Sequence, residues 1–196
     1  GFTNVRPWSH GVDTEIFKPG PKDYLDHLDL PRPVHMFLGR VTVEKNLPAF
    51  LNLDLPGSKV VIGSGPAREG LMARYPDVPF FIADGDRELV KYYNAADVFV
   101  FPSLTDTFGL VMLEALACGI PVAAFPVTGP KDVIGNSGVG ILDMNLAAAA
   151  VKARGIDPVA CREHALKFSW DAVVSEFLDY LEPFSPVQEP PVQAAQ

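Results

Sequence analysis

Cysteine is scarce in this sequence, and residues that commonly bind metals are scattered along it. The two cysteines, Cys118 and Cys161, form no CxxC pair and are too few for a disulfide framework. The four histidines lack the HxxxH-type spacing of a zinc site. Unpaired, infrequent thiols are typical of a reducing compartment, so we expect a cytoplasmic protein whose histidines are not metal ligands.

Long apolar runs and an excess of basic residues are also missing. No run approaches the length of a membrane span, and no signal peptide is visible. The formal net charge is -8, whereas nucleic-acid-binding proteins normally carry a basic excess, so nucleic acid is not an expected partner. A small anionic ligand is still compatible with this charge, because a few local donors suffice to bind it. The 196 residues, 48% of them hydrophobic, are enough for one packed domain.

Short apolar runs alternate with amphipathic stretches from Pro33 onward. The runs are rich in β-branched or aromatic residues and do not alternate with polar ones, as in strands buried on both faces. They comprise Val34–Leu38, Lys59–Ile62, Phe80–Ala83, Val98–Phe101, Val122–Phe125 and Val139–Leu142. Helices are expected between them, over Leu47–Leu53, Ala67–Tyr75, Arg87–Ala96, Gly109–Cys118 and Pro130–Ile134. This order predicts an α/β fold, a doubly wound parallel (Rossmann-like) sheet of about six strands with helices on both faces.

The chain divides into three regions by composition. Residues 1–32 are rich in Pro, Gly and Asp and are expected to form a linker that leads into the domain. Residues 33–182 contain the sheet domain and its trailing C-terminal helices. We expect the last helix, Trp170–Leu181, to turn Trp170, Val174, Phe177 and Leu181 inward at helical spacing. Residues 183–196 contain few large apolar side chains and are expected to be disordered.

Ligands of doubly wound sheets bind at the carboxyl ends of the strands, so the functional residues are expected in the loops there. Gly39, Arg40 and Lys45 follow the first run. The planar fork of an arginine suits phosphate oxygens and a lysine adds a point charge, so this loop resembles a diphosphate clamp. Spacing alone slightly favours the alternative, a solvated basic loop in which Glu44 pairs with one cation.

Two further loops carry weaker signals. Gly63-Ser64-Gly65-Pro66 lacks the GxGxxG spacing of a dinucleotide-binding loop and is better explained as a turn between strand and helix. Asp84-Gly85-Asp86 resembles a metal-binding DxD run. However, Asp86 is expected to cap the following helix, and Asp-Gly is ordinary turn chemistry.

The loop after Val98–Phe101 is the most informative. A helix that begins near Gly109 would direct free N–H groups and the positive end of its dipole into the cleft, where they favour an anion. Glu114 lies in apolar company on that helix and needs polar partners, which the hydroxyls of a ribose would supply. A half-exposed helix carboxylate is the alternative. Asp106 either accepts hydrogen bonds from a hexose or caps a turn.

The segment Ser103–Val122 resembles the signature of a large family of retaining glycosyltransferases, group 1 or family 4, which have the two-domain GT-B architecture. That signature places two acids, here Asp106 and Glu114, eight positions apart around a Phe-Gly pair and ahead of Gly-x-Pro-Val. Gly39-Arg40 followed by Glu44-Lys45-Asn46 is similar to the phosphate clamp of the same family. Gly11–Pro19 is similar to its interdomain linker, and Gly129–Ile134 also fits.

The resemblance implies that the chain is the donor-binding half of an enzyme that transfers a hexose from a UDP- or GDP-linked sugar with retention of configuration. Arg40 and Lys45 would bind the diphosphate and Glu114 the ribose, while Asp106 would be the catalytic residue in contact with the sugar. The remaining donor contacts would come from Gly39, Phe108, Gly109 and Leu110. No metal and no cofactor is implied. Because Asp106 precedes the helix, its loss is expected to spare the binding of free nucleotide.

The same resemblance implies that an N-terminal domain, absent from this chain, holds most of the acceptor. That acceptor would be a lipid or a saccharide, and the missing domain is also a potential contact with a membrane. Two features depart from the family pattern. Asp106 replaces the usual glutamate and is one methylene shorter, so its contact with the sugar is direct, water-mediated or lost. The loop 83–86 lacks the usual glycine after the third strand, which leaves the choice between uridine and guanosine open.

The variant Asp-Thr-Phe-Gly at 106–109 resembles members that transfer mannose or sulfoquinovose onto lipids. Two other functions are alternatives to the glycosyltransferase. A GT-B-shaped sugar-nucleotide epimerase would lack the Gly-Arg and Glu-Lys-Asn clamp. A non-catalytic binding or scaffolding module would have no reason to keep Arg40, Lys45 and Glu114 together.

Overall fold

A single open sheet of six strands forms the centre of the computed structural model, which describes residue 3 and residues 5–181. The strands are β1 (Val34–Leu38), β2 (Ser58–Ile62), β3 (Phe80–Phe81), β4 (Val98–Phe101), β5 (Val122–Ala124) and β6 (Gly140–Leu142). Every pairing between them is parallel, in the spatial order β3-β2-β1-β4-β5-β6. The predicted doubly wound parallel sheet is therefore confirmed. The predicted disordered tail, 183–196, lies outside the described residues.

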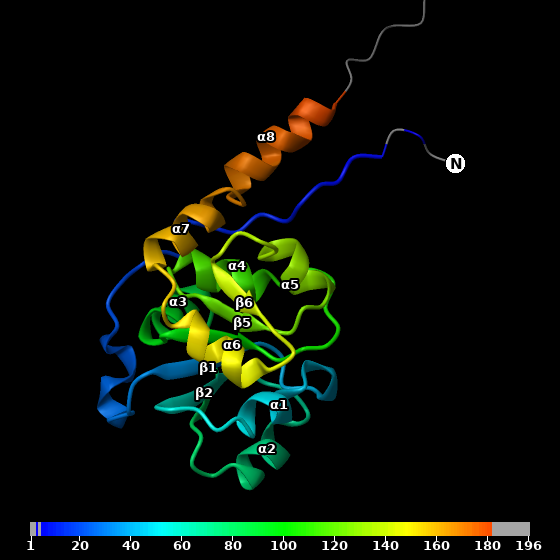
Figure 1. Cartoon of the computed structure of the whole chain (residues 1–196). Helices are drawn as coiled ribbons and strands as arrows, with labels where there is room; N and C mark the ends of the chain where they lie inside the picture. Colours follow the sequence, from blue (N-terminus) through cyan, green and yellow to red (C-terminus); the bar gives the residue numbers. More distant parts are fainter. Residues whose placement is uncertain (1–2, 4, 182–196) are drawn as a thin grey trace, which may run out of the picture.

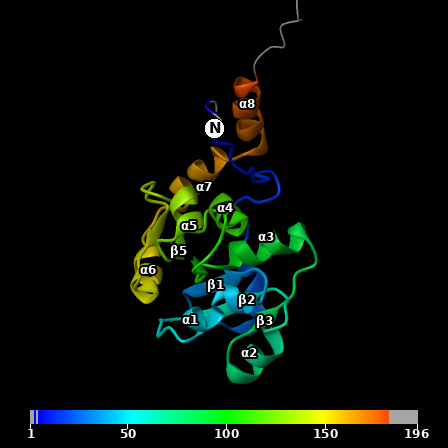
Figure 2. The same cartoon turned by 90° about the vertical axis from the view of Figure 1, so that its right-hand side faces the viewer.

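Helices cover both faces of this sheet (Figures 1 and 2). The helices are α1 (Leu47–Leu51), α2 (Arg68–Arg74), α3 (Asp86–Ala95), α4 (Leu110–Ala117), α5 (Thr128–Val133), α6 (Leu146–Ala153), α7 (Pro158–Leu166) and α8 (Trp170–Tyr180). One core cluster joins Phe37 and Val100 of the strands to Phe50 of α1 and Ala150 of α6. The cluster on the opposite face packs α3 and α4 on the sheet. Because both faces are covered, all five residues of β1 are buried, His35 included, which explains why the run does not alternate between apolar and polar residues.

The strand order fixes where a ligand can bind. From β1 the chain winds outward through β2 and β3, returns to the centre at β4, and winds the other way through β5 and β6. The carboxyl ends of β1 and β4 are therefore adjacent, and the loops that follow them diverge to opposite sides. In sheets of this order, such a switch point is the general ligand-binding crevice.

The N-terminal segment packs against this domain. Val12, Phe17 and Leu25 are buried, and a short 3-10 helix, η1 (Asp23–Leu28), lies beside α3. The guanidinium of Arg162 on α7 donates to the carbonyl oxygens of Thr14 and Phe17 at 2.8 and 2.6 Å. The segment predicted to be a linker is thus fixed to the sheet domain from about residue 12 onward.

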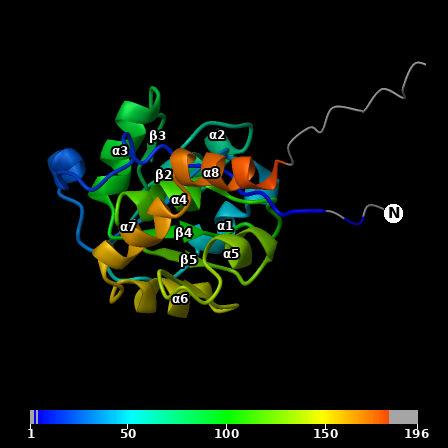
Figure 3. The same ribbon diagram turned by 90° about the horizontal axis from the view of Figure 1, so that it is seen from above.

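Helix α8 contradicts the sequence prediction. Trp170, Val174, Phe177 and Leu181, expected to face inward, are 40% to 55% exposed, and the only buried residue of this helix is Val173. The helix projects beyond the sheet, alongside the N-terminal segment (Figures 1 and 3). Its contact there is Trp8, whose indole Nε1 donates to the carbonyl oxygen of Val173 at 3.0 Å. Helical spacing identified the apolar face correctly, but within the described residues this face meets the extended N-terminal segment, with Gly11 against Trp170 and Trp8 near Phe177, and stays half exposed.

The start of α3 also differs from the prediction. Gly85, not Asp86, occupies the capping position, and no side chain caps the helix from there. Instead, Glu88 reaches back, and its Oε2 accepts a hydrogen bond from the backbone N–H of Asp84 at 2.6 Å. Its Oε1 accepts another from the Tyr24 hydroxyl at 2.7 Å. A carboxylate inside the first turn therefore stabilises this terminus.

No helix in the described part of the chain has the length and hydropathy needed to cross a membrane.

The glycine run after β2 serves the packing of two strand-end loops. Gly63 and Gly65 adopt φ angles of 144° and 153°. A Cβ on Gly63 would collide with the carbonyl oxygen of Gly39, and one on Gly65 with that of Val41. The backbone N–H of Val41 donates to the Ser64 carbonyl oxygen at 2.8 Å across the same contact. The turn predicted here therefore supports the neighbouring Gly39–Arg40 loop.

Replacement of Gly63 by alanine is expected to lower the free energy of unfolding by about 2–4 kcal/mol, because backbone strain and overpacking add at this position. Gly70 of α2 is the matched control, since an added Cβ there meets no atom within 4 Å. Gly70→Ala should raise stability by roughly 0.5–1 kcal/mol, as for alanine over glycine inside a helix. Urea unfolding of both variants measures the difference. Equal midpoints would show that the two loops do not need the glycine.

Candidate functional site

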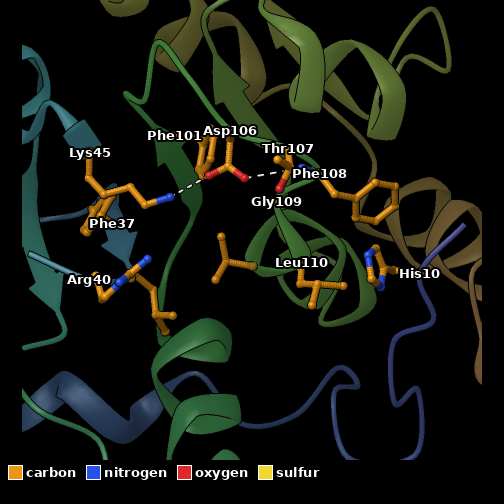
Figure 4. Close-up of a pocket in the computed structure, with 13 residues that line it drawn as sticks. His10, Phe37, Arg40, Lys45, Phe101, Asp106, Thr107, Phe108, Gly109 and Leu110 are labelled. Carbon is orange, nitrogen blue, oxygen red and sulfur yellow. Dashed lines mark hydrogen bonds and ion pairs between the residues drawn. The ribbon is translucent and has the colours of Figure 1, made fainter. Parts of the chain in front are cut away.

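A pocket of about 290 Å³ opens at the switch point between β1 and β4 (Figure 4). Seven of the eight residues predicted to contact the donor line it: Gly39, Arg40, Lys45, Asp106, Phe108, Gly109 and Leu110. The exception is Glu114. The structure thus brings together two loops that lie about sixty positions apart in the sequence, as expected for strand ends at one edge of a sheet. What these residues bind is still a prediction.

The wall after β1 supplies the positive charge. Arg40 is exposed, and among the described residues its guanidinium has no hydrogen bond or ion pair, so it is available to a ligand. Lys45 ends the short 3-10 helix η2 (Val43–Lys45). The next residue, Asn46, donates from Nδ2 to the Pro102 carbonyl oxygen at 3.1 Å, which fixes this loop to the loop after β4. Figure 4 shows Arg40 and Lys45 on the same side of the pocket.

Lys45 is paired with a different carboxylate from the one considered in the sequence. Its Nζ lies 2.5 Å from Oδ2 of Asp106, and both side chains are largely shielded, at 20% and 13% exposed. Glu44, the expected competitor, is exposed and forms no ion pair within the described residues. The pair joins the two walls of the pocket, as the dashed line in Figure 4 shows.

The wall after β4 presents backbone amides. Gly109, with φ of 87°, precedes α4 and provides no side-chain cap, so the first N–H groups of this helix stay available. The φ of Gly109 lies in the region that other residues rarely adopt, which favours glycine here, and a Cβ would also displace the flexible end of Met112. The loop is supported from behind by α5, because a Cβ on Gly129 would lie 2.8 Å from the Phe108 carbonyl oxygen. Free amides and a helix dipole at this position favour an anion.

Glu114 lies one turn beyond Leu110 on α4, half-buried and outside the pocket lining. The Tyr93 hydroxyl donates to its Oε2 at 2.7 Å, and Tyr93 is itself fully buried. Burial raises the pKa of the Glu114 carboxyl, while this hydrogen bond opposes the rise. The partner that the sequence required for Glu114 is therefore a tyrosine of α3, at least in the absence of a ligand.

His10 is a pocket residue that sequence reasoning missed. It belongs to the N-terminal segment, and its ring centroid lies 5.2 Å from that of Phe108. In the sequence it is one of four scattered histidines, and nothing in the spacing connects residue 10 with residue 108. Its position directly before the Gly11–Pro19 motif was the one available signal.

The charge balance of the pocket favours an anionic ligand. Two cationic side chains and the start of α4 face a single carboxylate, that of Asp106. No group of three or more His, Cys, Asp or Glu side chains that could hold a metal ion occurs within the described residues. The arrangement suits a diphosphate at Arg40 and Lys45, with polar groups of the same ligand near Asp106.

Comparison with known proteins gives a consistent result. The family model described as "Glycosyl transferases group 1" matches residues 32–154. A GDP-mannose-dependent alpha-mannosyltransferase of Mycobacterium tuberculosis (strain CDC 1551 / Oshkosh) is 32% identical over 93% of this chain and 52% of its own length. A sulfoquinovosyl transferase of Arabidopsis thaliana is 31% identical over 88% of this chain and 38% of its own length.

Solved structures show the same fold. Sucrose-phosphate synthase from Thermosynechococcus elongatus has a TM-score of 0.71 at 28% identity, over 89% of this chain and 51% of that one. HepE from Anabaena, in complex with UDP-glucose, has a TM-score of 0.71 at 18% identity, over 87% of this chain and 56% of that one. The chain therefore spans about half the length of these relatives.

Proposed function

The chain belongs to the group 1 glycosyl transferases, and from that premise we propose that it binds the nucleotide sugar for a retaining hexosyl transfer. The observation that carries this proposal is the placement of Arg40 and Lys45 opposite the free amide end of α4 at the switch point. Two cations and a helix terminus are suited to a diphosphate. The same groups would stabilise the charge that develops on the leaving diphosphate as the sugar departs.

The other site residues receive roles from this arrangement. Asp106, beside the cationic clamp, would accept hydrogen bonds from hydroxyls of the sugar, and the amides near Phe108, Gly109 and Leu110 would contact the phosphate. Glu114, already oriented by Tyr93, would accept hydrogen bonds from the ribose. Because the clamp and the helix terminus supply positive charge at the diphosphate, the proposal requires no metal and no cofactor.

The acceptor and the second half of the active site are assigned to an N-terminal domain. This chain matches 52% and 38% of the length of the two relatives, which leaves room in each for such a domain. The exposed apolar face of α8, with Trp170, Val174 and Phe177, would pack on that domain. The acceptor would be a lipid or a saccharide, and we propose a cytoplasmic enzyme that contacts a membrane through the N-terminal half.

The nucleotide is proposed to be UDP or GDP. One relative is named as dependent on GDP-mannose, whereas the HepE structure contains UDP-glucose. The loop after β3 does not select between uridine and guanosine. It carries Ala83-Asp84-Gly85 in place of the family's usual glycine directly after the strand, and the backbone N–H of Asp84 is already bonded to Glu88.

Isothermal titration of the chain with UDP, GDP and ADP tests the proposal directly. We expect one of the first two nucleotides to bind with heat that saturates at one equivalent. A module that only retains the fold as a scaffold would bind none of the three, and that result would overturn the proposed function.

A further inference from the structure

The ion pair between Lys45 and Asp106 bridges the two walls of the pocket, the loop after β1 and the loop after β4. The distance of 2.5 Å between Nζ and Oδ2 indicates a charge-assisted hydrogen bond. The second oxygen of Asp106, Oδ1, lies 3.4 Å from the backbone nitrogen of Phe108, a long and weak contact. Lys45 is therefore the main partner of this carboxylate, and the carboxylate neutralises one of the two cations of the clamp.

A diphosphate that engages Lys45 must draw the lysine away from Asp106 or share it. A largely shielded carboxylate that loses its cation is costly unless new donors replace it. The hydroxyls of a sugar attached to the diphosphate are such donors. A free nucleoside diphosphate carries none at that position, so it leaves Asp106 unpaired beside a phosphate of the same charge.

Arg40 provides the internal contrast. It is exposed and, within the described residues, forms no hydrogen bond or ion pair; its neighbouring carboxylate is that of the exposed Glu44, which interacts with it only at longer range. Arg40 can meet the diphosphate without breaking an existing hydrogen bond or ion pair. Of the two cations proposed to bind the diphosphate, only Lys45 is thus paired with Asp106, the residue proposed to contact the sugar.

We propose that Asp106 is a specificity-determining residue that makes the pocket favour the intact nucleotide sugar over the free nucleoside diphosphate by holding Lys45 whenever no sugar is present. The inference rests on the proposed function and deepens it. With donor bound, Asp106 bonds the sugar hydroxyls and Lys45 turns to the diphosphate. After transfer the hydroxyls leave with the product, Asp106 takes Lys45 back, and the spent nucleotide is released more readily. This changes the expectation from sequence position that Asp106 does not affect free nucleotide.

The test compares free and sugar-linked nucleotides by titration of the whole chain with UDP, UDP-glucose, GDP and GDP-mannose. The isosteric variant Asp106→Asn removes the charge that holds Lys45. It should bind the free diphosphate about five- to tenfold more tightly, which matches the strength of a shielded ion pair. The sugar nucleotide should gain nothing, so the ratio of the two dissociation constants should fall by the same factor.

Two backgrounds separate the ion pair from a general loss of negative charge. In Lys45→Gln, addition of Asp106→Asn should tighten the free diphosphate much less than in the wild-type background, because it relieves only the repulsion between Asp106 and the phosphate and no lysine remains to be released. In Arg40→Gln, the same addition should still tighten it. Asp132→Asn, on the exposed side of α5, removes an equal charge outside the pocket and should have no effect.

The possible results distinguish failure of this inference from failure of the proposed function. Equal tightening in the Lys45→Gln background would mean that the charge acts on the ligand directly, and the inference would be wrong. An unchanged affinity of Asp106→Asn for UDP and GDP would also refute it, while wild-type binding would leave the proposed function in place. Failure of the wild-type chain to bind any of the four ligands would instead overturn the proposed function, and this inference with it.

Discussion

The 196-residue chain on its own is expected to bind donor nucleotide and to transfer no sugar. Catalysis of group transfer requires donor and acceptor in one fixed geometry, which accounts for a large part of the rate. The described part of the chain has one sheet, and both of its core clusters serve the packing of that sheet. In the proposed enzyme the acceptor is held by a second domain, and closure of that domain over the pocket would complete the site.

The measurement is product formation from labelled UDP-glucose or GDP-mannose with candidate lipid and saccharide acceptors. The chain should give nothing beyond slow hydrolysis of the donor. An N-terminal half fused at Gly1 should restore turnover, and the same fusion with Arg40→Ala should stay inactive as the matched control. Robust transfer by the 196 residues alone would refute the two-domain proposal, since the acceptor site would then lie within this chain.

The sheet was predictable because burial on both faces leaves a direct mark on the sequence. Val34–Leu38 and Val98–Phe101 were predicted at their observed limits, since each is a short, mostly apolar run without alternation; His35 is the one polar residue among them. The strand at Phe80–Phe81 is shorter than expected because it is an edge strand, where Ile82 is exposed and pairing stops early. The order of strands was not predictable, because it is decided by tertiary pairing and leaves no local pattern.

The wrong prediction that the apolar face of α8 is buried also arose because tertiary packing leaves no local pattern in the sequence. Periodicity reports that one face of a helix is apolar, but not which surface covers that face. Trp170 and Phe177 occupy the spacing of a buried stripe, yet they extend past the sheet and contact only what lies beside them, such as Trp8. The proposed interface with an N-terminal domain would cover this stripe.

Seven residues of the pocket lining were predicted from the sequence, whereas His10 was missed, Glu114 lies outside the lining, and the contacts within the site were not predicted. Arg40, Lys45 and Asp106 reach one pocket because they follow strands whose ends are adjacent. The pairing of Lys45 with Asp106 joins positions 61 apart, and that of Tyr93 with Glu114 joins positions 21 apart. Neither spacing carries a signal. Those contacts determine how the site behaves without a ligand, so the structure was needed to infer the selectivity of the pocket.

Loss of the Arg40 side chain is expected to weaken nucleotide diphosphate binding tenfold to more than a hundredfold. A guanidinium that faces a diphosphate forms charge-assisted hydrogen bonds worth about 1.5–3 kcal/mol, and no other described residue is placed to replace it. Lys45→Ala should have an effect of the same order. It removes a cation and leaves Asp106 as an unpaired carboxylate next to the phosphate.

Titration of Arg40→Ala and Lys45→Ala with UDP and GDP measures the loss, with Arg74→Ala as the control. Arg74 is an exposed arginine on α2, away from the pocket lining, so its removal changes the net charge equally without touching the site. Arg40→Lys should fall between wild type and Arg40→Ala, because it retains the charge but not the planar fork that fits two phosphate oxygens. If both alanine variants bound UDP and GDP as tightly as wild type, Arg40 and Lys45 would not be the diphosphate clamp, and the phosphate would have to be sought elsewhere along the start of α4.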